Sequence, residues 1–271
     1  MTTKIRLDSE IVSRGLAESR EKAKAYIMSG SVYVNNQKAC KAGDIVKAED
    51  IIEVRGNVLP FVSRGGLKLD KAIKVFDIKL DGLTCVDIGA STGGFTDCML
   101  QCGAKKIYSV DVGYGQLAWK IRCDQRVVNL ERTNFRHITA NEIPDVIDFA
   151  SADASFISLS LLLPPLFPLM KMGGRAVCLI KPQFEAGKDK VGKKGVVKDP
   201  AVHYEVLQKA AQFIQNSGFS LIALDFSPIK GPEGNIEFLA YIEKSENPQI
   251  YNTIDFNAVI EAAHSGLKEN I

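Results

Sequence analysis

The sequence has few of the residues on which metal binding and disulfide bonding depend. Its 271 residues include only three histidines and six cysteines, and no two cysteines have the CxxC spacing of a zinc site. Cys98 and Cys102 could share one face of a helix, but a metal there would need two further ligands. We therefore predict no metal site and interpret the cysteines as reduced, buried side chains of a cytoplasmic protein.

Long hydrophobic runs and an excess of one charge are also missing. The most apolar stretch, residues 156–172, contains Pro164, Pro165 and Pro168 and is too short to span a bilayer. We expect a buried helix that ends at these prolines, and we predict no membrane role. The formal net charge is only +2, so a nucleic-acid site would need local clusters of lysine and arginine.

Residues 1–58 predict a small module of two helices and a sheet. Apolar residues at helical spacing indicate a helix that stops at Gly15 and a second helix from Ser19 to Gly30. A strand at 32–34, an Asn-Asn turn and a strand near 51–54 follow. A unit of about 55 residues buries little core of its own and usually serves as an appendage.

This first segment resembles the S4-type RNA-binding domain. The matching residues are Arg6-Leu7-Asp8, Gly15-Leu16, Ser19-Arg20, Ala23, Ile27, Gly30, Val32, Val34 and Asn35-Asn36. The resemblance implies that the basic helix pair follows an RNA backbone, as phosphate electrostatics would favour. The implied contacts are Arg6, Arg14, Arg20 and Lys24. A small protein-interaction module with a charged, solvated face is the alternative interpretation.

From Leu83 onward, strands alternate with helices, which is the pattern of a mostly parallel α/β sheet. The turn at 230–234 is too short for a crossover helix, so the final strand should be antiparallel. This arrangement is typical of a Rossmann-like methyltransferase, which we assign to residues 59–246, with a helical tail at 247–271. The expected strands are 83–88, 106–111, 146–153, 175–181, 219–227 and 236–243, and the expected helices include 94–103 and 201–217.

The first of these strands ends in a glycine-rich loop, residues 87–94. Glycines let the backbone turn sharply and approach a ligand where a Cβ would clash. The loop matches neither the GxGxxG of a dinucleotide site nor a P-loop with its lysine. Asp111 ends the second strand and can accept hydrogen bonds from a ribose diol. These features favour S-adenosylmethionine as cofactor, with NAD as the alternative. The predicted cofactor-binding residues are Asp87, Gly89, Ala90, Ser91, Gly93, Gly94, Phe95, Asp111, Val112 and Asn134.

Charged residues recur at the ends of the later strands. Asp153 and Lys181 each end a strand, and Glu237 lies near the start of the last one. Strand ends at one edge of a parallel sheet converge on one crevice, so these charges should meet. A buried Lys181 ammonium would need carboxylate partners. Lys68, at the start of an earlier helix, is a fourth candidate, and two unrelated surface salt bridges are the alternative.

Motifs along nearly the whole chain together resemble the TlyA family of hemolysin A-like proteins. They are Ser63–Leu69, Asp87–Asp97, Asp111–Leu117, Glu131–Asn134, Ser155–Leu159 and Lys181–Glu185. The resemblance implies a ribosomal RNA 2′-O-methyltransferase that joins an S4-type domain to an FtsJ-like domain. It implies a cytidine target in 23S rRNA, with or without a second in 16S rRNA. The Lys-Asp-Lys-Glu tetrad of FtsJ-like enzymes falls on Lys68, Asp153, Lys181 and Glu237.

The tetrad suits the chemistry that the resemblance implies. A ribose 2′-hydroxyl is a weak acid, so we expect Lys181 to take or orient its proton. Like-charge repulsion from Lys68 should lower the pKa of Lys181. Asp153 and Glu237 should orient the two lysines and keep the site close to neutral.

A lysine-rich loop at residues 187–198 follows the strand that carries Lys181. Such a loop suits contact with an RNA backbone, and a solvated surface loop is the alternative. The predicted RNA contacts in this part of the chain are Arg64, Lys188, Lys193 and Lys194. We also expect a hinge at residues 55–60, a monomer when free, and ribosomal RNA or ribosomal subunits as partners.

Two other functions would fit parts of the sequence. A pore-forming hemolysin is suggested by the family's older name, but a secretion signal and a spanning segment are missing from the sequence. A non-catalytic RNA-binding ribosome-assembly factor would fit the first segment, but it would not need the tetrad or the glycine-rich loop.

Overall fold

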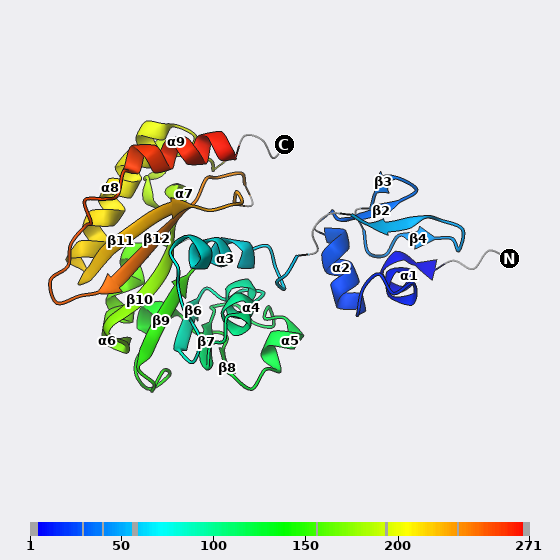
Figure 1. Ribbon diagram of the computed structural model, residues 1–271, viewed down its shortest axis with the longest axis horizontal. Coiled ribbons are helices and arrows are strands. Elements are labelled where there is room, and N and C mark those ends of the chain that lie inside the picture. Colours follow the sequence, from blue (N-terminus) through cyan, green and yellow to red (C-terminus); the bar gives the residue numbers. More distant parts are fainter. Residues whose placement is uncertain are drawn as a thin grey trace. The chain divides into compact units, whose positions relative to one another are not determined.

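The computed structural model describes residues 5–28, 30–39, 41–55, 59–155, 157–192, 195–231 and 233–267. The chain divides into two compact units, residues 1–64 and residues 65–271, which we call unit 1 and unit 2. Each unit has elements of its own (Figure 1), and the two are described separately below.

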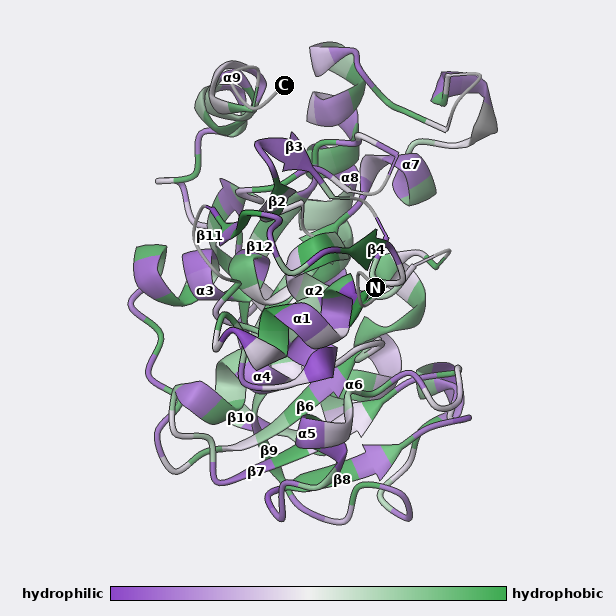
Figure 2. Cartoon of the chain, turned by 90° about the vertical axis from the view of Figure 1, so that its right-hand side faces the viewer, coloured by the Kyte–Doolittle hydropathy of each residue, from purple (hydrophilic) through white to green (hydrophobic). Residues whose placement is uncertain are grey.

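Unit 1 packs two helices against short strands. α1 (Leu7–Ser13) and α2 (Arg20–Met28) meet around a core that includes Leu7, Ile11 and Ile27. β2 (Val32–Val34) pairs antiparallel with both β3 (Gln37–Lys38) and β5 (Ile52–Val54), while β1 (Ile5–Arg6) pairs with β4 (Ile45–Val46). Figure 2 shows β2 and β4 as hydrophobic and β3 as hydrophilic, in line with the exposure of both β3 residues.

The Asn-Asn turn of unit 1 leads to a different strand from the one that the sequence predicts. Asn35 and Asn36 have φ values of 49° and 67°, which suit a two-residue hairpin turn. They connect β2 directly to β3, a two-residue strand that the sequence pattern does not reveal. β1 and β4 escape prediction for the same reason, because two residues are too few to show an alternating pattern.

Unit 2 is built on a seven-stranded sheet with the order β11-β12-β10-β9-β6-β7-β8. All neighbours from β10 to β8 are parallel, and β12 is antiparallel to both β10 and β11. The prediction of an antiparallel last strand is confirmed, and this strand lies inside the sheet with β11 at the edge. The strands are β6 (Thr84–Ile88), β7 (Lys106–Val110), β8 (Val127–Leu130), β9 (Ile147–Ala152), β10 (Met170–Ile180), β11 (Phe219–Phe226) and β12 (Phe238–Lys244).

Helices cover the sheet of unit 2. α8 and α9 lie beside each other next to β11 (Figure 1), and α3 packs on α4 and β12. The helices are α3 (Gly66–Val75), α4 (Gly94–Gln101), α5 (Trp119–Arg122), α6 (Leu163–Leu169), α7 (Pro182–Glu185), α8 (Pro200–Asn216) and α9 (Phe256–Gly266), with short 3-10 turns η1 (Phe135–His137), η2 (Leu159–Leu161) and η3 (Lys188–Lys190).

The expectation that prolines end the apolar helix is wrong. Pro164 and Pro165 stand at the first positions of α6, where a proline costs no intrahelical hydrogen bond, and Pro168 lies inside the helix. Residues 170–172 then belong to β10.

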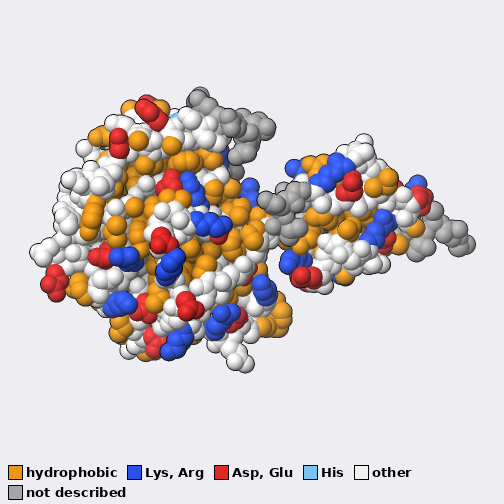
Figure 3. All heavy atoms as spheres, in the orientation of Figure 1, with side chains coloured by type: hydrophobic (Ala, Val, Ile, Leu, Met, Phe, Trp, Pro, Cys, Tyr) orange, Lys and Arg blue, Asp and Glu red, His pale blue; other side chains and the backbone are white. Residues whose placement is uncertain are grey.

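The outer surface of unit 2 carries charge of both signs. On the face shown in Figure 3, lysine and arginine side chains alternate with aspartate and glutamate. This mixture agrees with the net charge of +2.

Candidate active site

The register of the sheet brings three charged residues to one edge. Cys178 of β10 pairs with Ala152 of β9, and Ile180 of β10 pairs with Phe238 of β12. Asp153 and Lys181 therefore follow the carboxyl ends of adjacent parallel strands. Because β12 runs the opposite way, Glu237 precedes its strand at the same edge.

The structure brings these three residues and Lys68 of α3 into one ion-pair chain. The Asp153 carboxylate lies between the two lysines, with Oδ1 2.6 Å from Lys181 Nζ and Oδ2 3.0 Å from Lys68 Nζ. Lys68 Nζ is also 2.7 Å from Glu237 Oε2. The Glu237 side chain is 1% exposed and the Asp153 side chain 17% exposed, so the chain of charges opens to solvent at Asp153. Two separate surface salt bridges would not share a carboxylate in this way.

Lys68 is held as an ammonium ion. Burial of its side chain lowers its pKa, but the charges of Asp153 and Glu237 and their hydrogen bonds outweigh burial, so the pKa lies above its ordinary value. Lys181 contacts only one of the two carboxylates, and its Nζ also lies 3.3 Å from Ser155 Oγ.

Two further residues support the cluster, and the sequence analysis did not single them out as site residues. Ser155 comes two residues after Asp153, and its hydroxyl is the second polar partner of Lys181. Gly231 packs against Glu237, since a Cβ atom at Gly231 would lie 2.6 Å from Glu237 Oε1. The sequence indicates only a turn at Gly231, because spacing cannot show how closely its backbone approaches a side chain.

The glycine-rich loop follows β6 at the same edge of the sheet. Gly89 has a φ of +83°, and a Cβ atom there would lie 2.9 Å from Ala154 Cα. Gly93 has a φ of +94°, and its Cβ would lie 2.8 Å from Leu117 Cδ1. The first glycine thus lets the loop touch the segment that carries Asp153, and the second lets α4 begin at Gly94.

Asp87 lies beneath this loop and is fully buried. Its Oδ2 accepts a hydrogen bond from Thr96 Oγ1 at 2.6 Å, and its Oδ1 accepts one from Ser151 Oγ at 3.1 Å. Burial raises the pKa of Asp87 to about 6. Both oxygens are engaged inside the protein, so the geometry favours a role in shaping the loop.

Asp111 differs from Asp87 because it is only partly buried. Its Oδ2 accepts the backbone N–H of Ser91 at 2.7 Å, and its Oδ1 accepts that of Gly113 at 2.7 Å. Each carboxylate oxygen has a second lone pair, so a further hydrogen-bond donor can still bind. Val112 beside it is 71% exposed, which provides an apolar surface next to the carboxylate.

The other predicted cofactor residues lie around these loops. Ala90 and Phe95 are buried, Ser91 is exposed with a φ of 48°, and Asn134 Oδ1 accepts the N–H of Arg136 at the start of η1. Glu131 belongs to one of the family motifs, and its carboxylate joins Arg122 of α5, at 2.6 Å, to the N–H of Gln116, at 3.1 Å.

The predicted RNA-contact residues of unit 1 fall into two groups. Arg6 and Arg20 both bind the buried carboxylate of Asp8, and their side chains remain half exposed. These two guanidinium groups hold the pKa of Asp8 well below its usual range, chiefly through the hydrogen bonds from Arg6. Lys24 and Arg64 are exposed.

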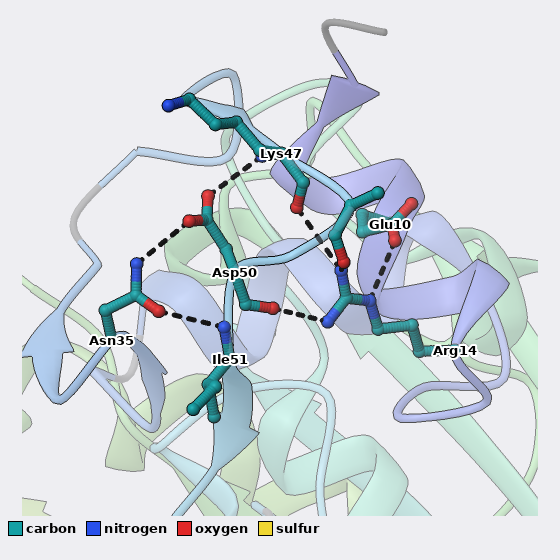
Figure 4. A network of polar contacts seen from close by, with 7 residues as sticks. Glu10, Arg14, Asn35, Lys47, Asp50 and Ile51 are labelled. Atoms are coloured by element: carbon teal, nitrogen blue, oxygen red, sulfur yellow. Dashed lines mark hydrogen bonds and ion pairs between the residues drawn. The ribbon is translucent and has the colours of Figure 1, made fainter. Parts of the chain in front are cut away.

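Arg14 is engaged within unit 1 (Figure 4). Its guanidinium donates hydrogen bonds to Glu10 Oε1 at 2.7 Å, to the carbonyl oxygen of Asp50 at 2.6 Å and to that of Ala48 at 3.0 Å. Asn35 fastens the same loop by bonds to Asp50 and Ile51. These donors of Arg14 hold the loop before β5, and its contact with RNA remains a prediction.

Some predicted features lie outside the described residues. These are Lys193, Lys194, the side chain of Lys188 and the centre of the expected hinge, residues 56–58. Within the described part of the chain, no group of three or more histidine, cysteine, aspartate or glutamate side chains is placed to hold a metal ion. None of the described helices combines the length and apolar character needed to cross a bilayer.

Comparison with known proteins agrees with this architecture. Residues 61–244 match the FtsJ-like methyltransferase family, and residues 5–52 match the S4 domain. A Bacillus subtilis protein named as an rRNA methyltransferase, YqxC, is 50% identical over 98% of this chain and 96% of its own length. The 16S/23S rRNA (cytidine-2′-O)-methyltransferase TlyA of Mycobacterium tuberculosis is 39% identical over 99% of both chains.

A solved structure shows the same fold. A protein from Streptococcus thermophilus, named as a hemolysin, superposes with a TM-score of 0.80 at 44% identity and covers 100% of this chain and 99% of its own. The parallel sheet with its antiparallel strand, the S4 unit and these relatives lead to one conclusion. The chain belongs to the TlyA family, whose members are FtsJ-like methyltransferases that carry an S4 domain.

Proposed function

We propose that this protein transfers a methyl group from S-adenosylmethionine to the ribose 2′-hydroxyl of a cytidine in ribosomal RNA. The observation that carries the proposal is the buried ion-pair chain of Lys181, Asp153, Lys68 and Glu237 beside the glycine-rich loop. The names of the relatives support a cytidine in 23S rRNA as the target, with 16S rRNA as a second candidate. Such a substrate implies that the protein works in the cytoplasm.

The residues around the loop after β6 fit S-adenosylmethionine. Asp111 offers carboxylate lone pairs for a ribose diol, and Val112 offers an apolar surface for an adenine ring. Gly89, Gly93 and Asp87 would keep the loop in its shape, while Ser91, Phe95 and Asn134 complete its surroundings. When bound, the cofactor supplies an electrophilic methyl group; the protein must supply the orientation and the proton acceptor.

Lys181 is the proton acceptor in this proposal. Its Nζ is held by one carboxylate oxygen of Asp153 and lies near the Ser155 hydroxyl. Lys181 thus faces one carboxylate, whereas Lys68 faces two. Lys181 Nζ would orient the 2′-hydroxyl and take its proton, and Asp153 would stabilise the resulting ammonium.

Lys68 would remain charged throughout. Asp153 and Glu237 both hold its proton, and their influence raises its pKa. Glu237 would keep Lys68 in place, because its buried carboxylate is paired with Lys68 and not with Lys181.

Arg6, Arg20, Lys24 and Arg64 would bring the RNA to the enzyme. Their exposed cationic groups suit contact with phosphate oxygens, which contributes affinity without reading sequence. Lys188, Lys193 and Lys194 of the basic loop would add further contacts with RNA phosphates.

The direct test is transfer of tritium from labelled S-adenosylmethionine to purified 23S rRNA, 16S rRNA and intact subunits, followed by mapping of 2′-O-methyl groups. We expect label at a cytidine ribose with the wild-type protein and at least about a hundredfold slower labelling with Lys181→Ala. RNA that is bound without methyl transfer would instead indicate a non-catalytic assembly factor. Label on a base would contradict the role given to Lys181.

A further inference from the structure

Asn235 is a buried side chain that joins two segments of unit 2. It is 1% exposed, its Oδ1 accepts a hydrogen bond from Val197 N at 2.9 Å, and its Nδ2 donates one to Gly195 O at 2.8 Å. The two bonds use the acceptor and the donor end of one amide. A carboxylate or an alkyl side chain of the same size cannot make both.

The first of these segments ends the basic loop, residues 187–198. Its described part is tightly folded, because Gly195 N donates to Gly192 O at 2.8 Å and Gly192 N donates to Val196 O at 3.2 Å. Lys190 is ion-paired with Glu205 of α8. Asn235 therefore holds the C-terminal end of the loop, whereas Lys190, nearer its start, is held by α8.

The second segment is the turn that carries Glu237. Gly231 N donates to the backbone oxygen of Asn235 at 2.9 Å, and the Gly231 backbone lies against the Glu237 carboxylate. A displacement of Asn235 would thus move both the backbone under Glu237 and, two residues along the chain, Glu237 itself.

The two segments also form the walls of a cavity of about 220 Å³. Lys198 lines it from the first segment and Lys230 from the second, while His264 and Leu267 close it from the C-terminal part. The cavity wall is almost entirely apolar, so Lys198 and Lys230 line it with their alkyl chains. Because Asn235 joins the two segments, it holds these two walls of the cavity together.

We propose that Asn235 is a positioning residue that couples RNA contact by the basic loop to the placement of Glu237. This inference rests on the proposed methyl transfer to RNA. Asn235 is buried, so it would act through its partners, which are Val197 and Gly195 on one side and Gly231 on the other. Loss of its amide would uncouple the end of the basic loop from the turn that carries Glu237.

The test compares Asn235→Ala and Asn235→Asp with wild-type protein, and uses Asn216→Ala, an exposed asparagine of α8, as the matched control. We expect Asn235→Ala to raise KM for RNA and to lower kcat, each on the order of tenfold, with unchanged affinity for S-adenosylhomocysteine. A purely structural role would lower the melting temperature and leave both kinetic constants unchanged below it, and that outcome overturns the proposal.

The Asp variant adds a readout that does not depend on a missing side chain. Its ionised carboxylate cannot donate to Gly195 O, whereas the protonated form can. The ratio of variant to wild-type kcat should therefore rise as the pH is lowered from about 8 to about 6. A ratio that does not change with pH contradicts the assigned donor.

Cleavage by trypsin separates failure of this inference from failure of the proposed function. Asn235→Ala should be cut faster than wild type at the lysines of residues 188–198, as seen by mass spectrometry, whether or not RNA is methylated. Equal cleavage of the variant and the wild type, with equal kcat and KM, would rule out the role of Asn235. Absence of methyl transfer by the wild-type protein would instead rule out the proposed function.

Discussion

Lys68 and Lys181 share the carboxylate of Asp153, but their surroundings are not equivalent. Lys68 has a second carboxylate partner in Glu237, and Lys181 has a neutral hydroxyl in Ser155. From the sequence, repulsion by Lys68 is the only influence expected to adjust Lys181. The geometry adds that the anionic partners are divided unequally, with two carboxylates at Lys68 and one at Lys181.

The first prediction concerns Lys181. Lys181→Ala should reduce kcat by about 10²- to 10⁴-fold, the usual contribution of a proton acceptor. Lys181→Arg should be equally impaired although it keeps the positive charge, because a guanidinium does not give up its proton near neutral pH. Single-turnover methyl transfer measures the rate, and calorimetric titration with S-adenosylhomocysteine checks the cofactor site. Activity close to wild type in either variant would exclude Lys181 as the acceptor.

The second prediction concerns the pH dependence of stability at Asp87. Its pKa rises from 3.8 in the unfolded chain to about 6 in the folded protein, so the folded state favours the protonated carboxyl. This contribution to stability is complete below the unfolded pKa and is lost as the pH rises through about 6. Asp87→Asn cannot ionise, so its unfolding free energy relative to wild type should increase from pH 4 to pH 7, by at most about 3 kcal/mol.

Chemical denaturation at several pH values measures this difference. Ser109→Ala is a useful control, because Ser109 contacts the same Thr96 hydroxyl but does not titrate. If the difference between Asp87→Asn and wild type were the same at pH 4 and pH 7, the Asp87 carboxyl would not be titrating in this range.

At the scale of elements, strands of five or more residues were predictable, and the charges at their ends with them. β6, β7, β9 and β11 lie close to the expected ranges. β8 was missed because its four residues are all half buried and include Asn129, so neither a continuous nor an alternating apolar pattern appears.

The candidate site was predictable only in part, for a physical reason. Residues that follow strands meet because the sheet dictates where strands end, which is why Asp153, Lys181 and Glu237 could be inferred together. Gly231 and Asn235 could not, since their importance depends on close approach between loops far apart in sequence. The partners of Arg14 within unit 1 could not be inferred either, because the sequence shows its charge but not its contacts.

The third prediction tests the glycine-rich loop. Gly89→Ala should weaken binding of S-adenosylhomocysteine on the order of tenfold, because the added Cβ would lie 2.9 Å from Ala154 Cα and displace the loop. Gly82→Ala is the matched control, since Gly82 has a similar φ of +72° but open space around it. Calorimetry measures both affinities. Both variants place alanine at a positive φ, but only Gly89→Ala adds a steric clash. Equal affinities of the two variants for S-adenosylhomocysteine would show that the clash is relieved without moving the loop.

At the scale of the whole molecule, the two units each have a core of their own. Leu7, Ile11 and Ile27 belong to the core of unit 1, whereas the tetrad and the glycine-rich loop lie entirely in unit 2. The division suggests separate tasks. Unit 1 offers exposed arginine and lysine side chains around a small core, and unit 2 holds the ion-pair chain of Lys181, Asp153, Lys68 and Glu237.

The fourth prediction follows from this division. Removal of residues 1–58 should leave the affinity for S-adenosylhomocysteine unchanged, because every cofactor-site residue is retained. KM for RNA should rise, and the slope of log affinity against log salt should become less steep, by roughly 0.7–0.9 for each phosphate that unit 1 neutralises in the intact protein. Filter binding at several salt concentrations measures the slope.

Point variants within unit 1 separate charge from folding in this last prediction. Lys24→Ala removes one exposed charge and should reduce the salt slope by about 1 without changing the melting temperature. Arg14→Ala removes the donors to three backbone carbonyls and to Glu10, so it should destabilise unit 1 by about 2 kcal/mol or more. The RNA affinity of this variant should fall only under conditions in which unit 1 unfolds, and hydrogen exchange measures that unfolding. A weaker RNA affinity of Arg14→Ala with unit 1 fully protected would instead make Arg14 a direct RNA ligand.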